Sequence, residues 1–264
     1  MKIVVLNVGN SRVTAALTTG AAVEEPAAVL QSGAAAPGLH DLRLLLVAAT
    51  PVAPDAAHEL AQELASLPEV RAGAPVALVS VVPSLDAPFT AALSRLLRID
   101  HTLPWPFPLA VQEPSTVGAD RLCNAAAAVA GGLADAIVVD AGTATTFDVV
   151  QGGAFVGGLI APGMALAASA LTARAARLEP QPFGPVPLQP ARDTATAIRA
   201  GCYHVGRQGV LGTLAELRRS LGSPPVIFTG GLAAHVAGDG DLVDPFWTLR
   251  GAAAAARQML AGES

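Results

Sequence analysis

Three short stretches of the sequence combine glycine with side chains that could bind an anion or move a proton. "LNVGNSRV" at 6–13 ends an apolar run in turn-forming residues, and "VVDAGTATT" at 138–146 has the same outline. "VGADR" at 117–121 places Asp120 beside Arg121. Backbone N–H groups and small hydroxyls at tight turns can bind phosphate. An acid next to an arginine could accept a hydroxyl proton and hold an anionic substrate, as phosphoryl transfer requires. On these residues alone, the more common interpretation is a first-turn acid that complements the helix dipole, with Arg121 as its surface partner.

Any fixed cation in such a site must be an arginine. Lys2, at the N-terminus, is the chain's only lysine. A Walker-type phosphate lysine and a Schiff-base lysine are therefore nearly excluded.

Composition narrows the class of protein further. The 264 residues carry a net charge of −5 with scattered basic residues, which argues against nucleic acid and membrane surfaces as partners. Cys123 and Cys202 lie far apart and form no metal-ligand pattern, as expected for reduced thiols in the cytoplasm. The first apolar run is too short for a signal peptide, and glycine pairs and Pro162 interrupt the uncharged stretch after Asp148. We expect a cytoplasmic protein.

The two glycine turns also predict how the chain is organised. Aligning Asn7 with Asp140 places Gly9 on Gly142 about half a chain length apart, and a strand-like stretch follows each turn. Both stretches are typical of β-hairpins, and alternating strand and helix patterns continue after each. This indicates an α/β fold with duplicated halves. We place the halves at 1–115 and 116–264, with the proline-rich crossing 98–117 at their junction.

Local patterns predict the remaining elements. Strands are expected at "RLLLVAA", "PVALVSVV" and "PPVIFTGG". Helices are expected near 54–67, 84–97, 119–130, 163–177, 194–220 and 248–261. A second proline-rich loop at 178–190 is long enough to be a lid or to pack on a partner subunit. A third glycine turn, "FTGGLAAH" at 228–235, follows a strand and opens a helix. Three such turns in a duplicated fold predict a nucleotide held between the halves.

An ordered set of motifs resembles the type III pantothenate kinase family over residues 3 to about 235. The motifs are "NVGNSR", "SVVP", "VGADR", "VVDAGTATTFDVV", "GGAFVGGLIAPGM", "DTATAIRAG" and "TGGLA". The resemblance implies duplicated ribonuclease-H-like domains, as in actin, sugar kinases and Hsp70, with the nucleotide cleft between them. It also implies ATP-dependent phosphorylation of the primary hydroxyl of pantothenate, the first step of coenzyme A biosynthesis.

Roles follow from the same resemblance. Asp120 matches the proton acceptor for that hydroxyl, and Asp140 matches the ligand of a potassium or ammonium ion. Thr143 matches an ATP contact, with Mg²⁺ accompanying the nucleotide. Thr194 matches a substrate contact near the interface of a homodimer. The pantothenate-binding stretch corresponds to Gly118, Ala119, Asp120 and Arg121. The ATP-phosphate loop corresponds to Asn7, Val8, Gly9, Asn10, Ser11, Arg12 and Val13.

Two positions depart from the family pattern. Asn7 stands where the family has an aspartate beside the metal–nucleotide complex, and Val111 stands where it has a substrate-contacting tyrosine. Losing a unit charge about 4 Å from its partner removes roughly 1 to 4 kcal/mol. Two alternatives therefore stay open: a weakened paralogue that acts as a regulator, like the Bvg accessory factors, and a kinase for another small hydroxy acid.

Overall fold

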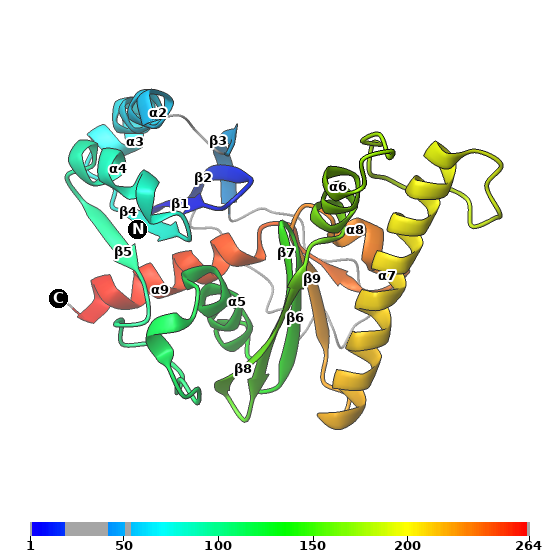
Figure 1. The fold of residues 1–264 in the computed structure, drawn as a ribbon. Coiled ribbons are helices and arrows are strands. Elements are labelled where there is room, and N and C mark those ends of the chain that lie inside the picture. Colours follow the sequence, from blue (N-terminus) through cyan, green and yellow to red (C-terminus); the bar gives the residue numbers. More distant parts are fainter. Residues whose placement is uncertain (1, 19–41, 51–53, 263–264) are drawn as a thin grey trace. The chain divides into compact units, whose positions relative to one another are not determined.

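The computed structural model describes residues 2–18, 42–50 and 54–262 (Figure 1). Within the chain, two compact units are distinguished. Unit 1 comprises residues 1–134, 150–156 and 246–264, and unit 2 comprises 135–149 and 157–245. The division of the sequence between residues 115 and 116 stays a prediction.

Unit 1 is built around a five-stranded sheet whose strand order is β3-β2-β1-β4-β5. Strand β1 (Val4–Val8) pairs antiparallel with β2 (Arg12–Thr18), which pairs antiparallel with β3 (Leu42–Ala49). On the other side, β4 (Val76–Ser80) and β5 (Leu96–Ile99) run parallel to β1. The carboxyl ends of β1, β4 and β5 therefore meet at one edge, where open α/β sheets bind their ligands.

Helices cover both faces of this sheet because successive strand residues point to opposite sides. One face of β1 packs with Leu60 of α2 (Pro54–Ser66) and Phe89 of α4 (Asp86–Ala92). Its other face packs with Cys123 of α5 (Ala119–Ala130) and Ala252 of α9 (Trp247–Gly262). Short elements complete the unit: α3 (Pro68–Arg71), η1 (Pro83–Leu85) and η2 (Pro114–Thr116).

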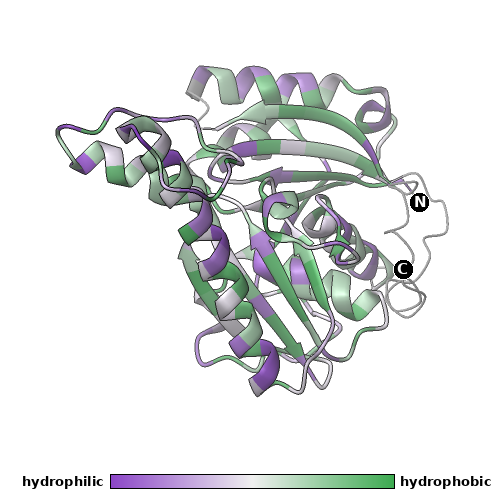
Figure 2. Cartoon of the chain, turned by 90° about the vertical axis from the view of Figure 1, so that its right-hand side faces the viewer, coloured by the Kyte–Doolittle hydropathy of each residue, from purple (hydrophilic) through white to green (hydrophobic). Residues whose placement is uncertain are grey.

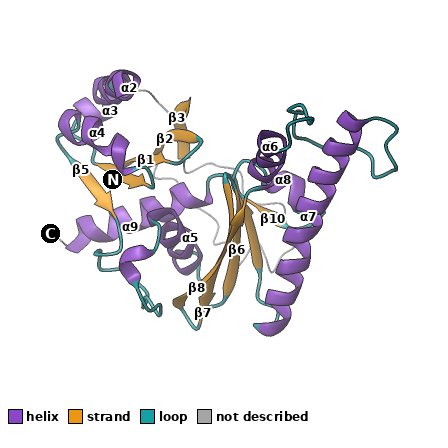
Figure 3. Ribbon diagram, in the orientation of Figure 1, coloured by secondary structure: helices purple, strands orange, loops and turns teal. Residues whose placement is uncertain are grey.

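The second sheet repeats the pattern of the first, with the strand order β10-β9-β6-β7-β8. Its strands are β6 (Ala136–Ala141), β7 (Ala144–Gln151), β8 (Ala154–Pro162), β9 (Val226–Thr229) and β10 (Leu242–Val243) (Figure 3). Strand β9 runs parallel to β6 and β10 parallel to β9, as β4 and β5 follow β1. The duplicated α/β architecture predicted from the two hairpins is thus confirmed.

Three helices accompany the second sheet: α6 (Met164–Arg174), α7 (Thr194–Ser220) and α8 (Ala233–Val236). Residues of all three join one apolar cluster with the inward-facing residues of β6, β7 and β9. Figure 2 shows α7 with alternating hydrophilic and hydrophobic bands, as expected for a helix with one buried side. Among the described residues, none of the helices has the length and apolar character needed to cross a membrane.

One predicted element is wrong. The helix expected near 84–97 ends at Ala92, and Leu96–Ile99 is strand β5. The short apolar run "LLRI" pairs in parallel with β4. A local pattern cannot reveal this pairing, because short apolar runs fit a strand and a buried helix equally well.

Candidate functional site

The first predicted phosphate loop is a tight hairpin at the carboxyl end of β1. The Gly9 N–H donates to the Arg12 carbonyl oxygen at 2.9 Å, which closes the turn. Val8 and Val13 are buried, whereas Asn10, Ser11 and Arg12 are exposed. Asn7 is half-buried and lies in register with Thr14 on β2 and Val79 on β4. The loop thus turns its polar residues outward at the edge of the sheet where a ligand is expected.

The loop after β4 connects this hairpin to the start of α5. The Val81 N–H donates to the Val8 carbonyl oxygen at 3.0 Å. A Cβ placed on Gly118 would lie 3.8 Å from Cγ1 of Val81. Two predicted site stretches, 7–13 and 118–121, are therefore brought to the same loop within unit 1.

Asp120 lies in the first turn of α5, and its carboxylate folds back over the helix N-terminus. Its Oδ1 accepts the N–H of Arg121 at 2.8 Å. A Cβ on Gly118, the N-cap residue, would stand 2.5 Å from the same oxygen, so position 118 must be glycine for this arrangement. Burial raises the pKa of Asp120 above the ordinary aspartate value, against the opposing effects of the Arg121 N–H and charge.

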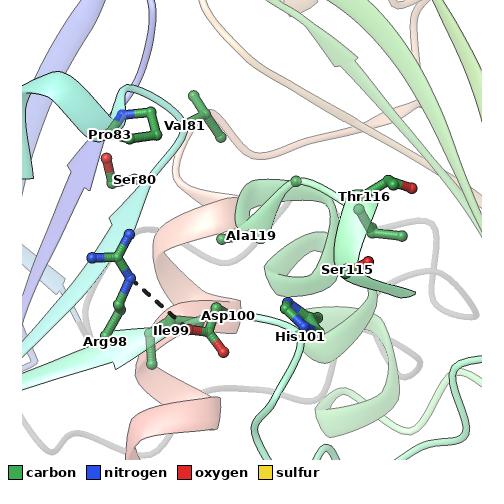
Figure 4. Close-up of a pocket in the computed structure, with 12 residues that line it drawn as sticks. Ser80, Val81, Pro83, Arg98, Ile99, Asp100, His101, Ser115, Thr116 and Ala119 are labelled. Carbon is green, nitrogen blue, oxygen red and sulfur yellow. Dashed lines mark ion pairs between the residues drawn. The ribbon is translucent and has the colours of Figure 1, made fainter. Parts of the chain in front are cut away.

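A pocket of about 320 Å³ opens beside the start of α5 in unit 1 (Figure 4). Its polar walls come from the carboxyl ends of two parallel strands and from the segment that leads into α5. Arg98 is fixed at this wall by ion pairs to the buried Asp86 (2.7 Å) and to Asp100 (3.9 Å). The lining residues are Ser80, Val81, Pro83, Arg98, Ile99, Asp100, His101, Ser115, Thr116, Val117, Gly118 and Ala119. The pocket can therefore take a small polar molecule that reaches Gly118 and Ala119.

The second predicted hairpin, in unit 2, also has a glycine directly after its first strand. The Gly142 N–H donates to the Ala144 carbonyl oxygen at 2.9 Å, two residues on, whereas the Gly9 N–H bonds Arg12, three residues on. Asp140, the last but one residue of β6, and Thr143, in the turn, are both half-buried. The two turns therefore share the position of the glycine, but the second loop is one residue shorter than the first.

Two glycines from other parts of unit 2 pack against this turn. Gly163 donates its N–H to the Thr143 carbonyl oxygen at 3.0 Å, and a Cβ on Gly163 would collide with that carbonyl. Gly230 has φ +88°, and a Cβ there would collide with the Asp140 carboxylate and lie 2.7 Å from the Ala141 carbonyl oxygen. The third glycine turn of the sequence therefore packs on the second hairpin, and both neighbours must lack a side chain.

Asp140 is the predicted ligand of a monovalent cation, and this assignment stays a prediction. In the described part of the chain, no cluster of three or more His, Cys, Asp or Glu could hold a metal ion. Mg²⁺ typically takes one or two carboxylates and completes its shell with water and substrate phosphates. The turn itself offers the Asp140 carboxylate and the nearby Ala141 carbonyl oxygen as oxygen ligands.

Thr194 lies elsewhere in unit 2, as the first residue of the long helix α7, where it is exposed. Asp193 caps this helix: its Oδ1 accepts the Thr196 N–H at 2.8 Å. The hydrogen bonds from Thr196 lower the pKa of Asp193 below its ordinary value. The cap fixes where α7 begins and so fixes the position of Thr194.

Sequence reasoning missed the polar wall of the pocket, above all Arg98, Asp100 and His101. All three residues fall in the stretch 98–117 that is predicted to be the crossing between the halves. Had Leu96–Ile99 been predicted as a strand parallel to β4, the polar run after it would have been placed at the ligand-binding edge.

Comparison with known proteins identifies the family to which the chain belongs. The family model described as type III pantothenate kinase matches residues 3–216. A type III pantothenate kinase of Thermomicrobium roseum is 42% identical over 61% of this chain and 65% of its own length. That of Acidiphilium cryptum is 44% identical over 56% of this chain and 58% of its own length. The match to these two relatives thus spans less than two thirds of their length.

Solved structures agree with the fold. A Baf family transcriptional activator from Campylobacter jejuni has a TM-score of 0.57 at 17% identity, with 98% of this chain and all of the other covered. The ROK hexokinase of Thermus thermophilus has a TM-score of 0.50 at 17% identity, with 99% of this chain and all of the other covered. The two proteins support the duplicated α/β fold of sugar kinases that the sequence predicts.

Proposed function

Since the chain belongs to the type III pantothenate kinase family, we propose that it transfers the γ-phosphoryl group of ATP to the primary hydroxyl of pantothenate. The observation that carries the proposal is Asp120, a carboxylate with a raised pKa in the first turn of α5, beside Arg121 and a polar pocket. This reaction is the first step of coenzyme A biosynthesis. We propose that it takes place in the cytoplasm.

Asp120 acts as the proton acceptor in this proposal. Its raised pKa strengthens the carboxylate as a base, while the N–H and the charge of Arg121 favour its ionised form. The hydroxyl oxygen attacks the γ-phosphorus, its proton passes to the Asp120 carboxylate, and the bond to the β–γ bridging oxygen breaks to release ADP. Most of the rate comes from holding the hydroxyl in line, since phosphoryl transfer needs little covalent help from the protein.

The 320 Å³ pocket is the proposed seat of pantothenate. The hydroxyls of Ser80, Ser115 and Thr116 suit the substrate's hydroxyl and amide groups. Arg98 forms ion pairs with Asp86 and Asp100, so we assign it to the wall of the pocket and not to the substrate's carboxylate. Arg121 is the cation assigned to the substrate's carboxylate.

Contacts to ATP are assigned in each unit separately, to the hairpin of unit 1 and to the turn at Thr143 of unit 2. Exposed polar groups of residues 10–12 and the turn at Thr143 offer donors to phosphate oxygens. Mg²⁺ accompanying ATP neutralises phosphate charge, and a potassium or ammonium ion at Asp140 adds positive charge beside it. Asn7 can bond a metal-bound water through its amide oxygen, although it lacks the negative charge of an aspartate.

We also propose a homodimer, supported by exposed apolar residues of unit 2. Ile160 on β8 is 65% exposed and Val205 on α7 is 75% exposed. The other large exposed apolar residues of this unit are Leu159, Leu166, Leu171 and Leu188. Apolar surface of this kind is characteristic of subunit interfaces. The substitutions Ile160→Asp and Val205→Asp are expected to shift the molar mass measured by light scattering from dimer to monomer, and an unchanged mass would contradict this assignment.

A coupled assay of ADP release tests the function. With pantothenate, ATP, Mg²⁺ and K⁺, the natural chain is expected to turn over, Asp120→Asn to lose turnover and Asn7→Asp to preserve or raise it. Asp55→Asn, an exposed carboxylate on α2 across the sheet from α5, is the matched control. Replacing K⁺ by Na⁺ is expected to lower the rate. Turnover with another hydroxy acid but not with pantothenate would favour the kinase alternative. No turnover in any form, in a folded protein, would favour the regulator.

A further inference from the structure

The guanidinium of Arg121 lies over an aromatic ring inside unit 1. Its central carbon is 5.6 Å from the centroid of the Phe155 ring, which is fully buried. A cation over a ring face is attracted to the negative face of the π-system, and the attraction is stronger where water is excluded. The ring therefore restrains a side chain that has many rotamers of its own.

Phe155 is itself held firmly by the backbone. The Phe155 N–H donates to the Pro108 carbonyl oxygen at 3.0 Å, and the Ala110 N–H donates to the Phe155 carbonyl oxygen at 2.9 Å. These bonds form a parallel bridge between Leu109 and Phe155. The two bonds fix the main chain from which the ring projects, and the ring itself is held by its complete burial.

At its other end, Arg121 is joined to the proposed base. Its N–H bonds Oδ1 of Asp120 at 2.8 Å and the Gly118 carbonyl oxygen at 3.1 Å. These two bonds come from the backbone N–H of Arg121, so they fix its main chain beside the base. The Phe155 ring contacts the other end of the residue, the guanidinium.

We propose that Phe155 is a positioning residue for acceptor binding: its ring holds the Arg121 guanidinium ready for the carboxylate of an acid substrate. The inference rests on the proposed function, because it takes Arg121 as the cation that binds the acceptor. Phe155 lies 34 positions from Arg121 in the sequence. In this proposal it does not contact the acceptor itself and acts on it only through Arg121.

Steady-state kinetics separate this role from simple packing. Phe155→Leu is expected to raise the KM for pantothenate about 3- to 30-fold, the range that a partly to fully desolvated cation–π contact spans, and to leave kcat and the KM for ATP within about twofold. Phe155→Tyr keeps the ring face and is expected to rescue the KM. Phe89→Leu, the same change at an equally buried position of unit 1, is the matched control and should leave all three constants near those of the natural chain.

A double-mutant cycle with Arg121→Gln adds a second measurement. If the ring acts through the guanidinium, Phe155→Leu should have little further effect on the KM once Arg121 is replaced. An unchanged KM in Phe155→Leu, in a natural enzyme that turns over pantothenate, would overturn the inference and leave the proposed function standing.

The contact can also be measured without turnover. The Nε–H resonance of Arg121, assigned by its loss in Arg121→Gln, should be shifted by the ring current and should move in Phe155→Leu, or in Phe155→Met if the leucine variant does not fold. An unmoved resonance would overturn the inference even if the protein phosphorylates no pantothenate. A moved resonance in an inactive protein would support the contact and contradict only the proposed activity.

Discussion

Replacing Gly251 by alanine is expected to separate two helices on which the site depends. Gly251 of α9 packs directly on the backbone of α5, and an added Cβ would collide with the Cys123 carbonyl group. Backbone cannot swing aside as a flexible side chain can, so α9 must withdraw from α5. Asp120 and Arg121 lie in the first turn of α5, so the change reaches the site as well as the core.

The cost follows from what the two helices share. Overpacking of this kind costs about 1 to 3 kcal/mol. Withdrawal also strains two buried bonds, from Trp247 Nε1 to the Asn124 carbonyl oxygen (3.0 Å) and from Thr248 Oγ1 to Asn124 Oδ1 (2.8 Å), each worth about 1 kcal/mol. The higher helix propensity of alanine offsets up to about 1 kcal/mol of this loss of stability. We expect a net loss of about 2 to 4 kcal/mol, which lowers the melting temperature by about 4 to 16 °C.

Thermal unfolding followed by circular dichroism measures this loss. Gly262→Ala, at the exposed end of the same helix with open space around it, is the matched control and should change the stability by less than about 0.5 kcal/mol. Below its melting temperature, Gly251→Ala should also show reduced kcat/KM. A melting temperature equal to or above that of the natural chain would refute the close packing of α5 and α9.

Three further outcomes follow from the structure. Because burial raises the pKa of Asp120, the natural chain should lose stability as pH rises from the ordinary aspartate pKa through the raised value. Asp120→Asn should lack that loss in melts at pH 4 and pH 7. Gly230→Ala should lower stability and raise the KM for ATP, since it adds strain at positive φ and a collision with Asp140, whereas Gly240→Ala at φ +86° has open space and should leave the KM unchanged. Asp193 has a lowered pKa, so its stabilisation is present above the ordinary aspartate pKa and is lost as pH falls through the lowered value. Asp193→Ala should therefore be less stable than the natural chain at pH 7, with the difference vanishing in strong acid.

Much of the fold could be predicted from local patterns. Both hairpins, the helix at 119–130 and the helix at 194–220 form where the periodicity and capping residues place them. Asp193, a polar residue directly before a helical pattern, is a typical start signal. These features depend on residues close together in the chain, which is why one sequence suffices.

The features that escaped prediction join distant segments. Strand β5 forms because it pairs with β4, and the Phe155 ring meets Arg121 because residues 108–110 pair with Phe155. From the sequence alone, Gly251 is only a residue that weakens a helix. Its close contact with the Cys123 backbone becomes apparent only in the structure. No single segment carries the signal for such contacts, since each arises only when two segments fold together.

The measurement that most directly tests the central claim is phosphorus NMR of the product formed from ATP and pantothenate with Mg²⁺ and K⁺. With the natural chain we expect a new phosphomonoester resonance from the phosphorylated primary hydroxyl of pantothenate, and with Asp120→Asn we expect none. A folded natural chain that produces no such resonance, or an Asp120→Asn variant that produces it at the natural rate, would contradict the kinase assignment.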